Sequence, residues 1–497
     1  MREFFVPCAA GLETIVEMEM RRITEQLAGG RDALDGGSVV TKQSKRGVTL
    51  WVSKDIPAAV QLPYWLTVCL RTGQRVLERI DGPVELRERD DLWSWVNAID
   101  WRPYMSVQDT LSVQVTLGND VPSDLRHTHF TALTVKDAIV KQFLTRDKSA
   151  RPSVDFVDPD LPLFVYLHQG RGTLYRAWSG AGSLHKRGYR KKMPKAALRE
   201  TMAAGMLYVS QWDPQSRQVL LDPMCGSGTI PIEAALMATR RMPGVVRLET
   251  FLADMNVEPY RTKGTRVAPD AESRAVSLLT HLHRTYDAPP RPSLGEDCRH
   301  DNYGDDLDGG LYDSDGDSVI NGMMSPVVRP FPFCRWPDFD EPVWRSVLRK
   351  CVEGERDIAA EGAEAPVIIY GSDRQEGAIA MARDAARRAG VSEHVQLSHN
   401  DIAHLQLPHR HKPDVIVSNP PWDIRLNSDA GAAWEAMRAF VCERAGGGRA
   451  WLLCGGDARD ELFGAMRMRA AKKRRIVQGG VEMSLRAFDI WDLHRDR

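Results

Sequence analysis

The first part of the chain alternates short apolar strands with amphipathic helices. Within residues 1–95 the pattern predicts a strand at Glu3–Val6, a helix at Leu12–Leu27, a strand at Gly47–Val52 and a helix that begins near Pro57. Apolar residues at every second position indicate the strands, and apolar residues three or four positions apart indicate the helices. This order is typical of a small α/β unit.

A second pattern of the same kind fills residues 105–180. The stretch LSVQV alternates as a strand does, and the apolar side chains of Thr131–Phe143 fall on one helical stripe. The stretch LFVYLHQGRGTLYRAW then predicts two antiparallel strands around a turn that contains glycine. We expect a second α/β unit here.

After residue 205 the chain changes to strand–loop–helix units whose strands are apolar throughout. Such strands are buried on both faces, as in a parallel doubly wound sheet with helices on each side. The pattern is lost between about residues 255 and 330, where Gly295–Ser318 is acidic, rich in glycine and poor in apolar residues. That segment buries too little apolar surface to offset its ordering entropy, so we expect a loosely ordered insertion.

Composition narrows the cellular setting more than the function. The formal net charge is −1, so a nucleic-acid surface has to be local. The eight cysteines include no CxxC pair, which favours reduced thiols inside a cell and no bound metal. No stretch approaches the ~18 consecutive apolar residues of a membrane span, and the N-terminus lacks the pattern of a signal peptide or a mitochondrial presequence. We therefore expect a cytoplasmic protein without membrane contact, or a nuclear one in a eukaryote.

One local cluster of positive charge interrupts this balance. Residues 171–199 contain nine lysines and arginines and no acidic residue. A run of like charges is often only a solvated linker. The alternative is a patch that contacts phosphate groups, for which the candidates are Lys186, Arg187, Arg190, Lys191 and Lys192.

Acidic residues and glycines follow three of the apolar strands. In LLDPMCGSGT, Gly226 and Gly228 come just after a strand that ends at Asp222, so the backbone can approach a ligand closely. A dinucleotide loop or a packing turn would show the same pattern. Asp373 ends the strand VIIYGSD, where it could hold a ribose diol, and Asp401 follows the next strand, where it could meet an adenine amino group. Together they predict a cleft for an adenosine that carries a polar tail.

The stretch PDVIVSNPPWDIRL predicts a buried strand that ends in a rigid polar and aromatic loop. The exocyclic amine of a base is a weak nucleophile, and acceptors aimed at its N–H bonds would activate it. Asn419 offers a side-chain carbonyl, and the peptide carbonyl of Pro420 offers a second acceptor. Trp422 gives a flat face on which a base can stack. Methylation at carbon 5 of a pyrimidine would instead need a thiol beside the proline, which this loop lacks.

These motifs together resemble the THUMP-domain class I methyltransferases that modify the exocyclic amine of guanine in structured RNA. FFVPCAAGLETIVEMEM is similar to their opening ferredoxin-like unit, and LRHTHFTALTVKDAIVKQFL is similar to their THUMP module. AALRETMAAGML, FCRWPDFD and GSDRQEGAIAMARDAARRAG also follow the family in order. The resemblance is strongest to the bacterial large-subunit rRNA enzyme and extends to archaeal and eukaryotic tRNA enzymes.

The resemblance implies an α/β protein of three domains. They are a ferredoxin-like domain at 1–95, a THUMP RNA-binding domain at 96–182 and, after a basic linker at 183–204, a Rossmann-like class I methyltransferase domain at 205–497 that contains the insertion at about 255–330. The second methyltransferase domain of the bacterial rRNA enzyme does not follow here. This favours a tRNA-type or stand-alone rRNA enzyme.

The resemblance also implies a cofactor and a set of site residues. S-adenosylmethionine is expected at Asp222, Cys225, Gly226, Gly228, Asp373 and Asp401, and the target guanine at Asn419, Pro420, Pro421 and Trp422. Arg425 joins the five basic linker residues as an RNA contact. The family's usual loop ends in Tyr-Gly, whereas this chain has Trp422 and Asp423.

The implied partner is a structured RNA, either tRNA or rRNA, and eukaryotic relatives add a small zinc-binding activator subunit. Three alternatives share parts of the pattern: adenine amino methylation of DNA, glutamine methylation of a protein, and a non-catalytic RNA-binding scaffold. The N-terminal RNA module counts against the first two, and the intact Asp222, Gly226, Gly228 and Asn419 count against the third.

Overall fold

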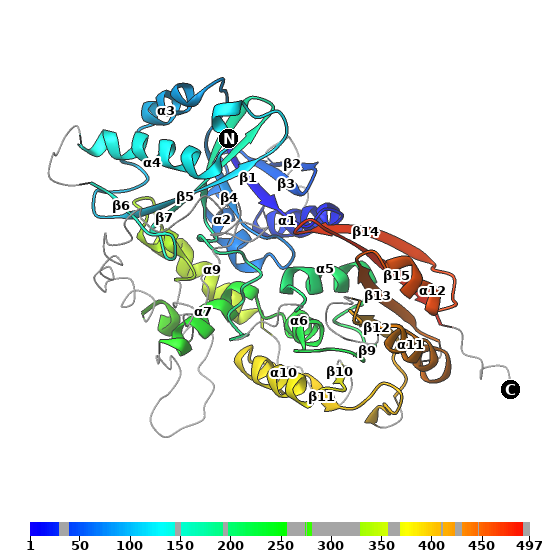
Figure 1. Ribbon diagram of the computed structural model, residues 1–497. Coiled ribbons are helices and arrows are strands. Elements are labelled where there is room, and N and C mark those ends of the chain that lie inside the picture. The colour runs from blue at the N-terminus through cyan, green and yellow to red at the C-terminus, as the bar shows by residue number, and fades with distance from the viewer. Residues whose placement is uncertain are drawn as a thin grey trace.

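The computed structural model describes residues 1–28, 39–144, 151–191, 197–255, 274, 276–280, 329–355, 368–408, 411–422, 430–445 and 447–490. Its strands form two β-sheets, and helices pack on both (Figure 1). Within these ranges, no helix has the length and apolar character that crossing a membrane requires. Most of the predicted insertion at 255–330 lies outside the described residues.

An eight-stranded sheet forms the N-terminal part, with the strand order β2-β3-β1-β4-β8-β7-β5-β6. Its strands and helices are β1 (Arg2–Pro7), α1 (Glu13–Ala28), β2 (Val39–Ser44), β3 (Gly47–Val52), α2 (Ala58–Cys69), β4 (Leu77–Glu85), α3 (Arg89–Ala98), β5 (Thr110–Leu117), α4 (Thr128–Leu144), β6 (Ser153–Val154), β7 (Leu161–His168) and β8 (Arg171–Ala177). β7 and β8 form the predicted antiparallel hairpin.

The two predicted N-terminal units share this sheet. β4 of the first unit pairs antiparallel with β8 of the second, so one ladder of hydrogen bonds joins them. The predicted boundary between residues 95 and 96 falls inside α3. We refer to residues 1–191 as the N-terminal module.

A seven-stranded sheet forms the C-terminal part, with the strand order β11-β10-β9-β12-β13-β15-β14. Its strands and helices are α5 (Glu200–Ser210), β9 (Val219–Asp222), α6 (Thr229–Ala238), α7 (Pro243–Asp254), α9 (Glu341–Glu353), β10 (Ile368–Asp373), α10 (Glu376–Arg388), β11 (Gln396–His399), β12 (Val415–Ser418), α11 (Ala430–Arg444), β13 (Arg449–Gly455), α12 (Arg459–Ala465), β14 (Lys472–Gln478) and β15 (Val481–Asp489).

Five of these strands are parallel, and they confirm the predicted doubly wound sheet. Every residue of β9 and β12 is buried, because helices cover both faces of the sheet. The chain runs outward from β9 through β10 to β11 and then returns to β12 on the other side of β9. Ligands of such sheets bind at this reversal, beyond the carboxyl ends of the strands.

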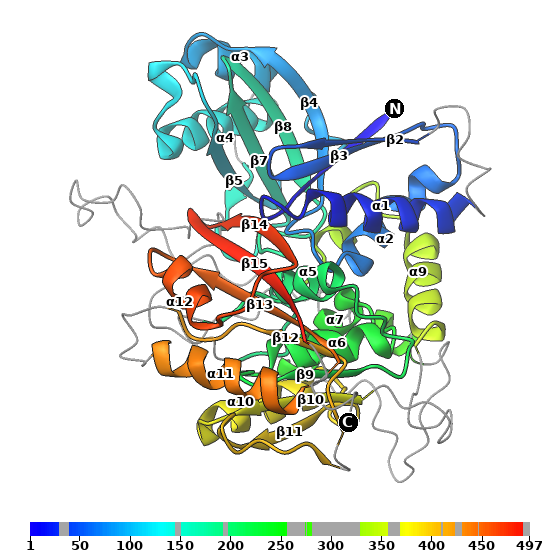
Figure 2. The ribbon, with the colours of Figure 1, turned by 90° about the vertical axis from the view of Figure 1, so that its right-hand side faces the viewer.

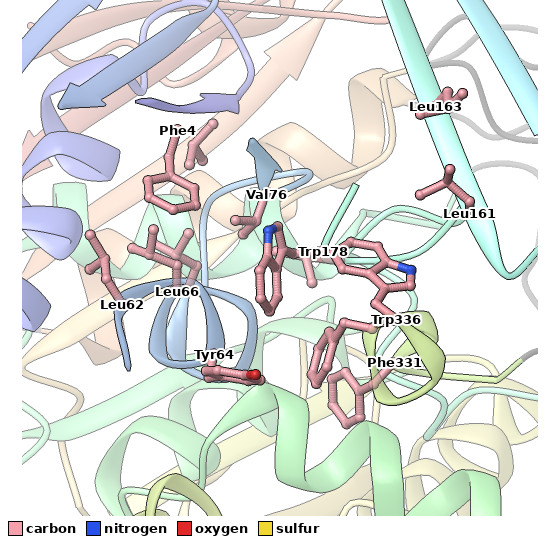
Figure 3. Packing of buried hydrophobic residues seen from close by; sticks show 14 of the residues in the cluster. Phe4, Leu62, Tyr64, Leu66, Val76, Leu161, Leu163, Trp178, Phe331 and Trp336 are labelled. Atoms are coloured by element: carbon pink, nitrogen blue, oxygen red, sulfur yellow. The ribbon is translucent and has the colours of Figure 1, made fainter. Parts of the chain in front are cut away.

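Aromatic residues from distant parts of the chain pack between the N-terminal module and the segment that contains α9 (Figure 3). Tyr64 of α2 packs edge to face on Trp178 at 5.0 Å and on Phe333 at 5.2 Å between ring centroids. The Tyr64 hydroxyl also accepts a hydrogen bond of 2.9 Å from the backbone N–H of Asp340. The predicted motif FCRWPDFD therefore anchors the C-terminal part of the chain to the N-terminal module.

The hairpin of β14 and β15 was not predicted from the sequence. β14 begins with KKRR, and a run of like charges indicates a solvated segment more often than a strand. β14 is the edge strand of its sheet, and charged side chains, lysine above all, are common there because they discourage pairing with other chains.

Candidate active site

Asp222 ends β9 as a buried carboxyl group. The Ser418 hydroxyl donates a hydrogen bond of 2.7 Å to Asp222 Oδ1, and the Met224 backbone N–H donates one of 3.2 Å to the same atom. Burial raises the pKa of Asp222 to about 7, although these two hydrogen bonds favour its ionised form. The contact with Ser418 joins the ends of β9 and β12, at the reversal of strand order.

The glycine loop after Asp222 has one packed side and one open side. Gly226 and Gly228 have φ angles of +54° and +78°, which favour glycine. A Cβ at Gly228 would lie 2.8 Å from the Cβ of Ala382 in α10. A Cβ at Gly226 would meet no described atom within 4 Å. The loop is therefore held by α10 at Gly228 and leaves room for a ligand at Gly226.

Asp373 connects the glycine loop to β10. Its Oδ2 accepts a hydrogen bond of 2.9 Å from the Gly226 N–H, and its Oδ1 accepts one of 2.9 Å from the Gln375 N–H. Each carboxylate oxygen keeps a further lone pair, so Asp373 can still accept hydrogen bonds from a ribose diol.

Asp401 lies beyond the end of β11. It is exposed, and its Oδ1 accepts a hydrogen bond of 2.8 Å from the Ala403 N–H. Parallel pairing in register places Asp222 beside Gly371 and Asp373 beside His399. The strand-end acids therefore lie at one edge of the sheet.

Cys225 is a packing residue of this loop. Its side chain is buried, and its N–H donates a hydrogen bond of 2.8 Å to the carbonyl oxygen of Ser372. Burial raises the pKa of the Cys225 thiol well above its usual value. A thiol that stays protonated is a poor nucleophile, so Cys225 is unsuited to attack a base.

The loop after β12 is fixed by two tryptophan hydrogen bonds. The Trp422 Nε1–H donates to Asn419 Oδ1 at 3.0 Å, within the loop itself. The Nε1–H of the fully buried Trp434, in α11, donates to the carbonyl oxygen of Pro421 at 3.1 Å. The Trp422 indole lies on the end of β13, where a Cβ at Gly455 would be 3.1 Å from its Cη2. After their predicted role, we call residues 419–422 the amine-binding loop.

These contacts refine the predicted roles of the amine-binding loop. The two residues expected to contact a base separately, Asn419 and Trp422, bond to each other, which leaves one lone pair on Asn419 Oδ1. No described residue donates a hydrogen bond to the carbonyl oxygen of Pro420. Arg425 lies outside the described residues.

Two family profiles match the chain. The family UPF0020, described as the RMKL-like methyltransferase domain, matches residues 187–289 and 321–487, which together exceed half of the chain. The chain belongs to this family. A THUMP-domain profile matches residues 87–176, within the N-terminal module.

The similarity to curated relatives covers more of the chain than the family match does. Over 436 residues the chain is 28% identical to the ribosomal RNA large subunit methyltransferase K/L of Aliivibrio fischeri, which covers 87% of this chain and 48% of the relative. A second relative of the same description, from Aliivibrio salmonicida, is also 28% identical over 436 residues. The chain thus spans about half the length of these curated relatives.

Solved structures share the fold along the whole chain. The crystal structure of SMU.472 in complex with SAH has a TM-score of 0.67 at 19% identity and covers 99% of this chain and 98% of its own. TrmN from Thermus thermophilus has a TM-score of 0.55 at 15% identity and covers 99% and 100%. At these identities the likeness shows the fold alone.

Methyltransferases of this family use S-adenosylmethionine, and the edge formed by β9 and β10 fits such a ligand. Open space faces Gly226, and the carboxylate of Asp373 has acceptor capacity left. The signals that predicted this edge were the glycines and the strand-end acids.

The predicted basic linker of this RMKL-like chain needs a correction. Arg187 is 1% exposed, and its side chain donates to the carbonyl oxygens of Leu184 at 2.7 Å and Arg71 at 2.6 Å. The side chain of Arg190 is 3% exposed and lies 2.7 Å from a carboxylate oxygen of Glu200. Neither guanidinium reaches solvent, so neither can bind an RNA phosphate in this structure. Both predictions were wrong because backbone carbonyl oxygens bind Arg187, and because Glu200, which directly follows the segment without acidic residues, pairs with Arg190.

The remaining linker candidates differ in their surroundings. Lys186 and Lys191 are exposed, and the Nζ of Lys191 lies 3.6 Å from a carboxylate oxygen of Asp254. Lys192 lies outside the described residues. As RNA contacts, these three lysines and Arg425 stay predictions.

Three residues of the site were missed by the sequence analysis: Ser418, Trp434 and Gly455. Ser418 directly precedes Asn419 at the end of a buried strand, which is a usable signal. Trp434 and Gly455 reach the loop only through the packing of α11 and β13, and no local pattern indicates that.

Proposed function

We propose that the chain transfers a methyl group from S-adenosylmethionine to the exocyclic 2-amino group of a guanine in ribosomal or transfer RNA. The observation that carries this proposal is the position of the amine-binding loop. Ser418 links its strand to Asp222, so the loop lies next to the glycine loop at the carboxyl edge of the parallel strands.

The amine-binding loop supplies what an aromatic amine needs in order to react. The amine's lone pair is delocalised into the ring, and acceptors aimed at the N–H bonds favour the pyramidal form that can attack. Asn419 Oδ1 and the Pro420 carbonyl oxygen are the two acceptors, and the Trp422 indole provides a face for the base. When bound, S-adenosylmethionine supplies an electrophilic methyl group, so no strong general base is required.

The cofactor is assigned to the edge formed by β9, β10 and β11. In this proposal Gly226 and Gly228 let the backbone approach it, Asp373 accepts from its ribose, and Asp401 meets its adenine amino group. Asp222 and Cys225 hold the glycine loop in place, Asp222 by accepting from the Met224 N–H and Cys225 by donating its own N–H to Ser372.

RNA is the substrate class that the relatives and the N-terminal module favour. The named relatives act on ribosomal RNA, and the THUMP match covers 90 residues of the N-terminal module (87–176). The target guanine has to leave its stack to reach the loop. We place this reaction in the cytoplasm. The small zinc-binding activator stays a prediction, which the activity of the chain alone would test.

The proposal is tested by methylation with the purified full chain. Total rRNA, tRNA and DNA are incubated with labelled S-adenosylmethionine, and the labelled nucleosides are separated. We expect N2-methylguanosine from RNA. Label in N6-methyladenosine would overturn the choice of base, and no label in any RNA would overturn the function.

Asn419→Ala tests the role of the loop. We expect kcat to fall by at least about 100-fold, because an acceptor for the reacting amine is lost, while the Kd for S-adenosylmethionine is unchanged. Asn119→Ala, at an exposed position of the N-terminal module, is the matched control and should keep kcat. Equal kcat in both variants would remove Asn419 from the reaction.

A further inference from the structure

A basic segment that the active site does not use runs from Arg467 to Arg475. It contains six arginines and lysines among nine residues and no acidic residue. All of these side chains except that of Arg474 belong to exposed residues. We call residues 467–475 the basic strip. It forms the turn after α12 and the first half of β14.

The basic strip lies beside the N-terminal module. Ala10 and Val477 form an isolated antiparallel bridge with N–H to O distances of 3.0 and 2.9 Å. One guanidinium nitrogen of Arg474 also donates to the carbonyl oxygen of Gly11 at 3.0 Å. Figure 2 shows the β14–β15 hairpin between the N-terminal module and β13.

The second strand of the same hairpin reaches the residue under the amine-binding loop, close to the bridge with Ala10, because Met483 pairs with Ile476. β15 pairs with β13 so that Met483 lies opposite Gly455. Gly455 is the residue on which the Trp422 indole rests. One hairpin therefore contacts both the N-terminal module and Gly455, the residue against which the Trp422 indole packs.

Part of the positive charge around the hairpin is already paired. Glu482 is shared by Arg475 at 2.6 Å and Arg459 at 3.1 Å. In contrast, Arg467, Arg469 and Lys473 are exposed and form no ion pair or side-chain hydrogen bond with any residue that the structure describes, although the charge of Lys473 acts on Asp460. These three side chains carry charge that is available to an external anion.

We propose that the basic strip binds the phosphate backbone of the RNA substrate and extends the RNA-binding surface from the N-terminal module along β14. This inference rests on the proposed function. Protection of the edge strand alone does not explain the strip, because the bridge to Ala10 already covers part of β14 and the turn before it carries Arg467 and Arg469. The predicted linker patch cannot take this role through Arg187 or Arg190, which are buried.

The strip is tested by the salt dependence of RNA binding. The logarithm of the RNA association constant falls as the logarithm of the salt concentration rises. We expect Arg469→Gln/Lys473→Gln to make this slope shallower by about 1.5, because two phosphate contacts are lost. Binding at ~0.1 M salt should weaken on the order of tenfold. The probe is an rRNA transcript that the wild-type chain methylates, and Kd is measured at several salt concentrations.

Arg383→Gln/Arg387→Gln is the matched control. It also removes two exposed positive charges, but from α10, on the far side of the C-terminal sheet from the N-terminal module (Figure 2). We expect its salt slope to equal that of the wild type. Calorimetric titration with S-adenosylmethionine should give the same Kd for both double variants, which shows that each one folds. The single variant Arg469→Gln should give about half of the change in slope.

The outcomes separate the two proposals. A wild-type chain that neither binds nor methylates RNA overturns the proposed function. A wild-type chain that binds RNA as tightly, and with the same salt slope, as Arg469→Gln/Lys473→Gln overturns the role of the basic strip and leaves the proposed function in place.

Discussion

At the scale of single residues, two indole N–H groups hold the amine-binding loop in place. Trp422 holds the side chain of Asn419, and Trp434 holds the carbonyl oxygen of Pro421. Trp434 is fully buried, so its hydrogen bond is shielded from competing water. We infer that Trp434 is a positioning residue, because it fixes the peptide group between Pro421 and Trp422.

The effect of Trp434 on catalysis can be separated from its effect on stability. Trp434→Phe removes the indole N–H and keeps an aromatic ring in the core. We expect kcat to fall roughly tenfold, because the loop loses a hydrogen bond that sets its geometry. The Kd for S-adenosylmethionine should stay the same. Both are measured on the purified chain.

Trp344→Phe is a closely matched control for this variant. Both tryptophans are 0% exposed, and each packs edge to face on a phenylalanine at 5.1 Å. The Trp344 Nε1–H has no hydrogen-bond partner among the described residues. Trp434→Phe should lose more stability than Trp344→Phe, by the ~0.5–1.5 kcal/mol of its hydrogen bond, and only Trp434→Phe should slow turnover. Equal kcat values would contradict the positioning role.

The role of a residue could be predicted only where the neighbouring sequence indicates it, as at the end of an apolar strand. The strand-end acid Asp222 and the loop around Asn419 follow apolar strands, so periodicity located both. The hydrogen bond from Trp434 and the burial of Arg187 depend on contacts between distant segments. The spacing of residues in a single sequence does not show such contacts. For this reason the run of arginines and lysines was predicted to be exposed.

At the scale of elements, a buried charge network connects the linker with α5 and α6. Arg190 donates to Glu200 at 2.9 Å and to the Thr229 hydroxyl at 3.0 Å. Thr229 is the first residue of α6 and directly follows Gly228. Burial alone would raise the pKa of Glu200, but the charge of Arg190 and the hydrogen bond with His185 lower it to about 2. The network therefore stabilises the start of α6, just behind the glycine loop.

Removing the carboxylate of Glu200 should leave the buried charge of Arg190 unpaired and destabilise the protein. We expect Glu200→Gln to lower the free energy of unfolding by roughly 3–5 kcal/mol, because the charge of Arg190 stays buried without a counter-charge. Denaturant unfolding measures the loss. Glu353→Gln breaks the exposed pair with Arg349 at 3.8 Å and should cost less than about 1 kcal/mol. Similar losses in both variants would show that the network contributes little.

Elements with a strong period were predictable, and the others were not. The helix over Thr131–Phe143 corresponds to α4, and the strand at Gly47–Val52 corresponds to β3. The hairpin of β14 and β15 escaped prediction because its first strand lies at an edge, where side chains need not alternate between core and solvent. Its pairing with β13 fixes it instead.

At the scale of the whole molecule, the N-terminal module and the C-terminal sheet are closely packed on each other. Two backbone carbonyls of the C-terminal part, those of Leu236 and Arg241, accept hydrogen bonds from the Arg71 side chain at 3.1 and 2.8 Å. α2 and α7 meet where Gly244 leaves no space: a Cβ there would lie 2.6 Å from the Cα of Val68. The N-terminal module is thereby held at a fixed position relative to the glycine loop and the amine-binding loop.

Gly244→Ala should disturb this contact. The added methyl group meets the backbone of α2, so we expect the free energy of unfolding to fall by about 1–3 kcal/mol. Gly377→Ala is the matched control, since both glycines are the second residue of a helix and no described atom lies within 4 Å of a Cβ at Gly377. That variant should gain roughly 0.4–1 kcal/mol. A gain in both would mean that α2 and α7 adjust freely.

The aromatic core of Figure 3 has a consequence for how the chain is made. Tyr64 and Trp178 leave the ribosome long before Phe333 and Trp344, the rings that cover them. Until the later segment has been translated, the nascent N-terminal module exposes an apolar surface of the kind that aggregates or recruits chaperones. A pause of translation between residues 255 and 330 would therefore lengthen the time for which the nascent chain depends on chaperones.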